Sequence, residues 1–231
     1  EGHDPGRVGL SIDHYDTATG LARRLGLHFR FAYHDRLSRD EGYLRGTTLE
    51  VLRTKIAISI DTDGQPKKNP SVRELALLDI FSAQPRSRFF APITWRASFG
   101  MKEPWLSTSL GPYVNGGLGT TVDIGSPRSP LWISALVDGE MLSNPDLAKQ
   151  TPMSLGPRLT ASWFPNATTR LGLDGGIHFP LNGGPRTDWL EAQLVQALTM
   201  NMELRLAGRD HLIDGKDNRE WSAQIYQHIL F

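Results

Sequence analysis

Cysteine is absent from the 231-residue chain, and the chain also lacks long apolar runs and an excess of charge of either sign. Without cysteine, disulfide bonds and thiolate metal sites are excluded. The 25 basic residues balance the 25 acidic ones, so overall charge gives no reason to expect a nucleic-acid partner. No apolar stretch approaches the roughly 18 residues that a membrane-spanning helix requires. The mean hydropathy of −0.33 is typical of soluble proteins, but transmembrane β-barrels escape this test because only alternate residues face lipid.

Alternation of apolar and polar residues is the dominant pattern that the chain does have. Leu27, Phe29 and Phe31 would share one side of a strand, while His28 and Arg30 would share the other. The 23 glycines and 15 prolines are spread throughout, which argues against long helices. The pattern therefore favours β-strands along the whole chain.

Twelve segments carry this alternation. They are 7–15, 20–34, 46–60, 71–83, 89–102, 108–124, 130–141, 153–164, 167–179, 187–198, 201–212 and 219–231. Two of them are less regular. The segment 46–60 changes phase between Val51 and Leu52, which indicates a β-bulge. The segment 71–83 is apolar on both faces and could instead be a short helix.

The end of the chain and the lengths of the connections indicate a membrane barrel. The chain alternates up to a terminal Phe231, and we expect Tyr226, Ile229 and Phe231 to form a C-terminal signal for the barrel-assembly machinery. With Phe231 at the periplasmic rim, most connections on that side are short and most on the other side are longer, as in outer-membrane barrels. The exceptions are 35–46, which is long, and 16–20, which is short.

These features predict an all-β fold: a single antiparallel transmembrane β-barrel of about twelve strands, covering 1–231, in the bacterial outer membrane with both termini periplasmic. The strands are long enough, since a lipid-facing strand needs about 9–11 residues. Aromatic residues near strand ends would form interfacial girdles; they are Trp105, Trp132, Trp189, Trp221, Tyr15 and Tyr33. A soluble β-sandwich or barrel would use the same alternation with the tryptophans inside and the charges outside.

The polar face of the barrel would line its lumen with charges of both signs. The predicted luminal charges are Arg30, Lys55, Arg96, Asp123, Asp138, Arg158, Arg170, Asp174, Glu191, Glu203 and Arg205. Balanced charges can pair across a lumen, and each buried charge needs a partner. We therefore expect an occluded or very narrow lumen with little steady conductance, although a narrow channel remains an alternative.

Catalytic and metal-binding patterns are weak in the sequence. Candidate Ser/His/acid groups are His14 with Asp16, His34 with Asp35 and Ser38, and His211 with Asp210. Neighbouring strand residues point to opposite faces, so adjacency does not assemble a triad. The histidines show no ligand spacing on one strand, and we expect no catalytic residue, metal or cofactor in this barrel. A lipid- or lipoprotein-modifying barrel is the alternative enzyme hypothesis.

Three stretches resemble a bacterial protein family: GHDPGRVGL at 2–10, FRFAYHDRL with GYLRGTTLE at 29–50, and PRSRFFAPITWR at 85–96. The motifs cover residues 1–110, and the rest resembles the family in architecture. One departure is Phe31, where the family pattern has proline. Members carry an N-terminal periplasmic domain of the Lnb type and a C-terminal outer-membrane barrel. The resemblance implies that this chain is the barrel part of a longer protein, in agreement with a first stretch, EGHDPGRVGL, that lacks the features of a signal peptide.

The resemblance leads to a functional hypothesis: an outer-membrane anchor and scaffold that positions its own N-terminal periplasmic domain. The family-like stretches 35–46 and 83–96 map to the predicted periplasmic end. His34, Asp35, Tyr43 and Arg86 would form a docking rim there, although 35–46 could instead plug the barrel base. The other expected partners are phospholipid and lipopolysaccharide of the outer membrane.

Overall fold

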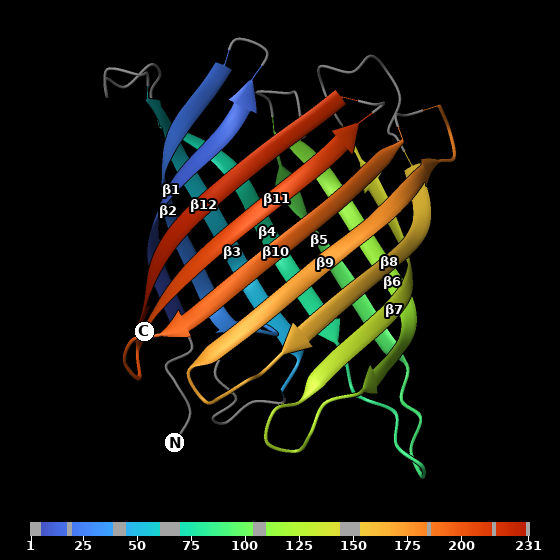
Figure 1. The fold of residues 1–231 in the computed structure, drawn as a ribbon. Coiled ribbons are helices and arrows are strands. Elements are labelled where there is room, and N and C mark those ends of the chain that lie inside the picture. The colour runs from blue at the N-terminus through green and yellow to red at the C-terminus, as the bar shows by residue number, and fades with distance from the viewer. Residues whose placement is uncertain are drawn as a thin grey trace.

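The computed structural model is a barrel of twelve antiparallel strands (Figure 1). It describes residues 6–17, 20–38, 45–60, 70–103, 110–143, 153–183, 186–213 and 216–229. The strands are β1 (Gly6–Thr17), β2 (Gly20–His34), β3 (Thr47–Ile60), β4 (Ser71–Ser82), β5 (Thr94–Lys102), β6 (Gly111–Asp123), β7 (Leu131–Leu142), β8 (Met153–Trp163), β9 (Thr169–Pro180), β10 (Thr187–Ala197), β11 (Met202–Ile213) and β12 (Lys216–Ile229). Among the described residues, no helix is long and apolar enough to cross a membrane.

Each strand pairs with the next one along the chain, and β1 pairs with β12 to close the sheet. The closing ladder runs from Gly6 opposite Ile229 to Tyr15 opposite Glu220. Closure is required in hydrocarbon, because each unpaired backbone N–H or C=O there costs several kcal/mol. The described ends of the chain lie at the same end of the barrel (Figure 1). The predicted fold class and strand number are therefore confirmed.

The two irregular segments are both strands with bulges. In β3, Leu52 has a φ of 54°, and the pairing with β2 shifts register between Phe29 and Phe31. The predicted bulge at this point is therefore confirmed. In β4 the pairing with β5 shifts between Ala76 and Leu78, so Leu77 is left on the outer surface, 41% exposed. This bulge explains why the β4 sequence looks apolar on both faces, and the alternative of a short helix is wrong.

The strand predicted at 89–102 begins later than expected, at Thr94. Continuing the β5–β6 register past the Thr94–Gly119 pair would place Pro92 opposite Thr121. Proline has no backbone N–H to donate to a ladder. The N–H of Arg86 donates to the carbonyl of Thr121 instead, at 2.9 Å, and Pro85 forms a parallel bridge with the same residue. Residues 85 and 86 of the connection between β4 and β5 therefore pair with Thr121 of β6 at the position that a longer β5 would have occupied.

The outer wall of the barrel is apolar and the inner wall is polar. Leu10, Leu118, Leu159 and Leu190 are each 59% to 64% exposed on the outside, on strands spread around the barrel. The inward positions include Arg7 and Asp13, both with 0% exposure. The soluble alternative, with tryptophans inside and charges outside, is therefore wrong. An apolar outer wall on a closed antiparallel sheet makes the chain an outer-membrane β-barrel.

Only part of the predicted aromatic girdle faces outward. Trp221 is 62% exposed on the outer wall, where its ring covers Gly208. Trp132 and Trp189 point inward instead, because each shares the register of inward residues on its strand, and Tyr15 lies inside beneath the guanidinium of Arg24. Trp105 lies outside the described residues, and of Tyr33 only the backbone is described.

Placing a charge on the outer wall should destabilise the barrel according to its depth. Leu159 lies near the middle of β8, and Leu159→Arg should lower the free energy of unfolding by about 2–4 kcal/mol, because arginine is costly at the bilayer midplane. Met200 is exposed in the turn between β10 and β11, so Met200→Arg is the control and should cost at most about 1 kcal/mol. Urea titration of both variants folded into lipid vesicles checks this. Equal costs at the two positions would contradict the assignment of the outer wall to lipid.

Candidate functional site

A ladder of ion pairs runs along the inner wall from β5 to β9. The carboxylate of Asp138 on β7 lies 3.3 Å from Nη1 of Arg96 on β5 and 3.5 Å from Nη1 of Arg158 on β8. Nη2 of Arg158 lies 2.6 Å from the carboxylate of Asp174 on β9. These side chains are at least four-fifths buried, so each charge needs the partner that the register provides.

A second group of charges depends on the bulge in β3. Arg53 pairs with Glu50 on the same strand and with Glu74 (2.7 Å) and Asp79 (3.3 Å) on β4. Glu50 also pairs with Arg30 on β2. Residues 50 and 53 would lie on opposite faces of a regular strand, and the bulge at Leu52 brings both inside. Glu50 and Arg53 are absent from the predicted luminal charges, although the phase change after Val51 was the signal that could have revealed them.

Ten of the eleven predicted luminal charges are buried or half-buried on the inner wall, whereas Asp123 is exposed at the end of β6. Those ten are Arg30, Lys55, Arg96, Asp138, Arg158, Arg170, Asp174, Glu191, Glu203 and Arg205. Asp123 shares the inward register of β6, where it pairs with Trp132, but as the last residue of the strand its Oδ1 accepts a hydrogen bond from the N–H of Gly125 at 3.0 Å. The carboxylate stabilises a turn at the barrel end instead of pairing across the lumen.

The start of the connection between β2 and β3, residues 35–38, folds into the lumen; we call it the inserted turn. The turn is held locally by the N–H of Leu37, which donates to Oδ1 of Asp35 at 2.8 Å. Leu37 is 1% exposed and packs against Gly172 of β9, where an added Cβ would come within 2.7 Å of its Cδ1. Strands β1, β12, β11 and β10 separate β2 from β9 around the wall. The inserted turn therefore spans the interior to a distant strand.

Ion pairs fix both sides of the inserted turn. On the far side, Nη1 of Arg36 lies 3.5 Å from the carboxylate of Asp174. On the near side, Asp35 pairs with Arg205, and its Oδ2 lies 3.9 Å from Arg7. Burial alone would raise the pKa of Asp35, but Arg205 and Arg7 outweigh it and hold this pKa well below its usual value of 3.8. Asp35 is therefore ionised at physiological pH and binds the turn to the wall.

Tyr226 supports the arginines around the inserted turn. Its ring is 1% exposed, and the guanidinium carbon of Arg7 lies 3.8 Å from the ring centroid. Gly9 on β1 makes room for the ring, because a Cβ there would lie 2.1 Å from Cδ1 of Tyr226. Tyr226 is thus an inward packing residue, whereas Ile229 is only half-buried at the end of β12 and Phe231 lies outside the described residues. Their role as an assembly signal stays a prediction.

The predicted docking rim is not assembled as a surface. His34 and Asp35 are 2% and 8% exposed and belong to the interior, because the chain turns inward directly after β2. Arg86 is exposed at the barrel end, and Tyr43 lies outside the described residues. The most exposed apolar residue at this end is Phe89, at 93%, with Phe90 beside it at 67%. Both phenylalanines belong to the family-like stretch 83–96.

The candidate catalytic groups whose side chains are described do not form triads. Ser38 donates to Asp35 at 3.2 Å, but this contact closes the inserted turn and the same carboxylate is bound by arginines. His211 faces inward, whereas Asp210 is exposed beside Arg219, as expected for strand neighbours. His14 is described, but the side chain of Asp16 is not.

One serine–histidine–aspartate group does come together in the lumen. Ser154 Oγ lies 3.3 Å from Nδ1 of His178, and Nε2 of His178 lies 3.3 Å from Oδ2 of Asp138. Nε2 makes no hydrogen bond with any described residue, and Asp138 is already paired with Arg96 and Arg158. In a catalytic triad the acid orients the histidine by a hydrogen bond. Asp138 does not orient His178 in this way, so the group is not a catalytic triad. Among the described residues, no three His, Asp or Glu side chains are grouped to hold a metal ion.

Comparison with known proteins agrees with this fold. Residues 1–228 match one protein family, described as a domain of unknown function (DUF7840). An outer-membrane channel from Pseudomonas putida F1 superposes with a TM-score of 0.56 at 12% identity, covering 97% of this chain and 95% of the channel. The transport unit of the autotransporter AIDA-I from Escherichia coli gives a TM-score of 0.50 at 10% identity, covering 98% and 89%. No curated protein matches the sequence.

The inserted turn should keep the lumen closed to ions. In planar bilayers we expect the wild-type barrel to show little or no steady conductance, because the turn and its ion pairs occupy the lumen. Replacing residues 35–38 by four glycines removes the charges and Leu37, so stable single-channel steps should appear. A matched control replaces residues 126–129 of the β6–β7 turn, of which 126–128 are exposed, with glycines and should stay silent. Stable nanosiemens channels in the wild type would contradict the assignment.

Proposed function

The chain belongs to the DUF7840 family, and we propose that it serves as a closed outer-membrane anchor that positions a periplasmic domain of the same protein. In this role the lumen is filled and does not transport solutes. The periplasmic end of the barrel holds the partner domain. The main support for this role is the inserted turn, because its residues occupy the lumen and bind to the inner wall.

The closed lumen is supported by how the inserted turn is held. Leu37 fills the space above Gly172, Arg36 pairs with Asp174 on β9, and Asp35 pairs with Arg205 on β11. Removing one partner of a buried ion pair costs about 3–5 kcal/mol, so opening the lumen would require several such costs together. A barrel with this interior is suited to holding a fixed shape in the membrane. The Pseudomonas putida barrel is a channel, and this chain shares its fold at only 12% identity.

The anchoring role is supported by the end of the barrel that holds the described termini. The connections that follow β2 and β4 meet this end, and they include the stretches that resemble barrels with a Lnb-type periplasmic domain. The turn at 87–90 is well defined, since the N–H of Ser87 donates to the carbonyl of Phe90 at 2.8 Å. It exposes Phe89 and Phe90 at this end of the barrel. Exposed apolar residues of this kind often mark an interaction site.

Photo-cross-linking in the intact protein tests the anchoring role. With benzoylphenylalanine in place of Phe89, the full-length protein should form a cross-link between the barrel and the periplasmic domain, detected after proteolysis between the two. The same substitution at Leu212, which is 40% exposed near the opposite end of β11, is the matched control and should give no such product. If neither site cross-links while the periplasmic domain is present and folded, the anchoring role is wrong.

A further inference from the structure

Charged side chains of the outer wall gather near the end of the barrel opposite the described termini. Arg23 lies near the start of β2 and Asp188 near the start of β10, while Asp210 and Arg219 are opposite each other on β11 and β12. Each of these residues faces outward, because the next residue along its strand faces the lumen. The charges therefore mark one rim of the lipid-facing surface.

The carboxylates of this rim have arginine partners, whereas Arg23 has no described carboxylate. Asp188 accepts hydrogen bonds from Nε and Nη2 of Arg186, at 2.9 and 2.8 Å. The carboxylate of Asp210 lies 3.6 Å from Nε of Arg219. Arg23 is exposed and forms no ion pair with any described residue. Its charge is therefore available to an anion outside the chain.

Arg23 lies just beyond the apolar band of β2. The outward residues that follow it on the strand are Leu25, Leu27, Phe29 and Phe31. From Phe31 to Arg23 the strand advances by eight residue steps, or about 26 Å along its axis. A tilted strand crosses the hydrocarbon with about 9–11 residues. The guanidinium of Arg23 is therefore at the level of the lipid headgroups, toward which arginine side chains extend.

His14 and Trp221 lie beside Arg23 on the same face, and we call these three residues the outer row. His14 is opposite Arg23 in the β1–β2 ladder and opposite Trp221 in the β1–β12 ladder. Residues opposite each other have Cβ atoms about 4.5–5.5 Å apart, so the three side chains are neighbours. Trp221 is 62% exposed, and its ring lies over Gly208. The outer row thus offers a guanidinium, an imidazole and an indole N–H at headgroup level.

We propose that the outer row binds a phosphate group of lipopolysaccharide in the outer leaflet. With the termini at the periplasmic side, the end that carries Arg23 faces the outside of the cell. The outer leaflet there consists of lipopolysaccharide, whose lipid A part carries phosphate groups. Arginine can donate two parallel hydrogen bonds to a phosphate, and the acyl chains of the same molecule would lie along the apolar band of β2. This site does not depend on the anchoring role.

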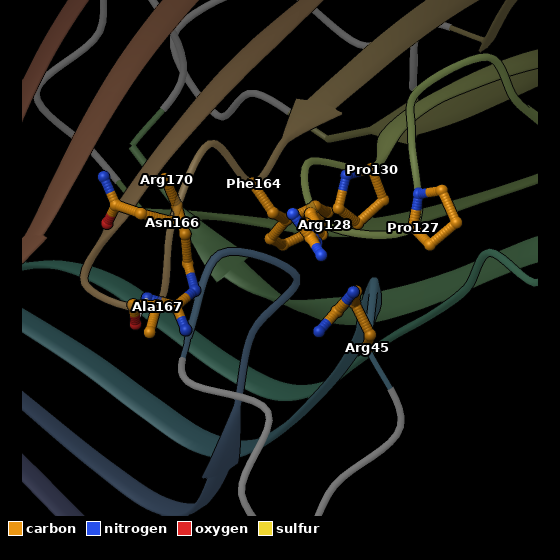
Figure 2. Close-up of a pocket in the computed structure, with 8 residues that line it drawn as sticks. All are labelled: Arg45, Pro127, Arg128, Pro130, Phe164, Asn166, Ala167 and Arg170. Carbon is orange, nitrogen blue, oxygen red and sulfur yellow. Dashed lines mark hydrogen bonds between the residues drawn. The ribbon is translucent and has the colours of Figure 1, made fainter.

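The arginines at the opposite end of the barrel have a different setting. Arg45, Arg128 and Arg170 line a cavity of about 430 Å³ at the end that holds the described termini (Figure 2). Arg170 and Phe164, which both line it, are each 4% exposed, so the cavity belongs to the mouth of the lumen. Arg128 is exposed at its edge and, like Arg23, forms no ion pair with any described residue. It is therefore a matched control for an arginine outside the outer row.

Native mass spectrometry of the full-length protein released from maltoside micelles tests the site. Three lipids are compared: lipid A with both phosphates, the same lipid A without phosphates, and phosphatidylglycerol. Phosphorylated lipid A should bind at least about tenfold more tightly than the form without phosphates, because only its phosphates accept charge-assisted hydrogen bonds. Equal binding of the two forms would overturn the proposal. Phosphatidylglycerol binding as tightly as phosphorylated lipid A would contradict the assignment to lipopolysaccharide.

Arginine variants separate the outer row from general attraction between lipid A and positive charge. Arg23→Gln should weaken binding of phosphorylated lipid A about tenfold. Arg128→Gln removes the same charge from an exposed position at the other end, and binding should be unchanged. Each variant is first checked for the heat-modifiable migration of a folded barrel. An unchanged affinity in Arg23→Gln, or equal weakening by the two substitutions, would overturn the proposal.

Discussion

The closure of the sheet between β1 and β12 is the constraint on which the rest of the structure depends. A sheet in hydrocarbon cannot leave an edge unpaired, so the twelve strands must form a tube. A tube has two walls, and the strict alternation of side chains sends every second residue to each of them. Once the apolar residues face lipid, residues such as Asp138 and Arg158 have no position other than the lumen. The ion pairs are a consequence of closure.

The charged lumen explains why the interior is filled. Inward charges far from water require partners, and the pairing of strands places opposite charges beside one another. The inserted turn joins this network, since Asp35 contacts Arg205 on β11 and Arg36 contacts Asp174 on β9. The glycine at 172 leaves the space that Leu37 fills. The interior is thereby a packed core made of charges, which gives the barrel a fixed shape.

Much of the fold was predictable from the sequence, because period-two alternation depends only on local residue order. The twelve strands and the bulge before Leu52 were found in this way. The contacts that close the lumen were not predictable, because they join residues distant in sequence, such as Leu37 and Gly172. The role of Asp123 in a turn was also not predictable, since alternation gives the face of a residue and does not reveal where a strand ends and a turn begins. The inward tryptophans Trp132 and Trp189 were missed because nearness to a strand end was taken as a sign of lipid contact.

The central claim is that residues 35–38 cross the lumen and rest on β9, and the absence of native cysteine makes it directly measurable. A double variant with cysteine at positions 37 and 172 is folded into vesicles and treated with an oxidant, and intramolecular disulfide formation is measured by mass spectrometry. The account predicts a disulfide in high yield, because Leu37 lies against Gly172. A cysteine pair at 135 and 159, which are opposite each other on β7 and β8, serves as the positive control. Failure of the 37–172 pair to form while the control pair forms would contradict the account.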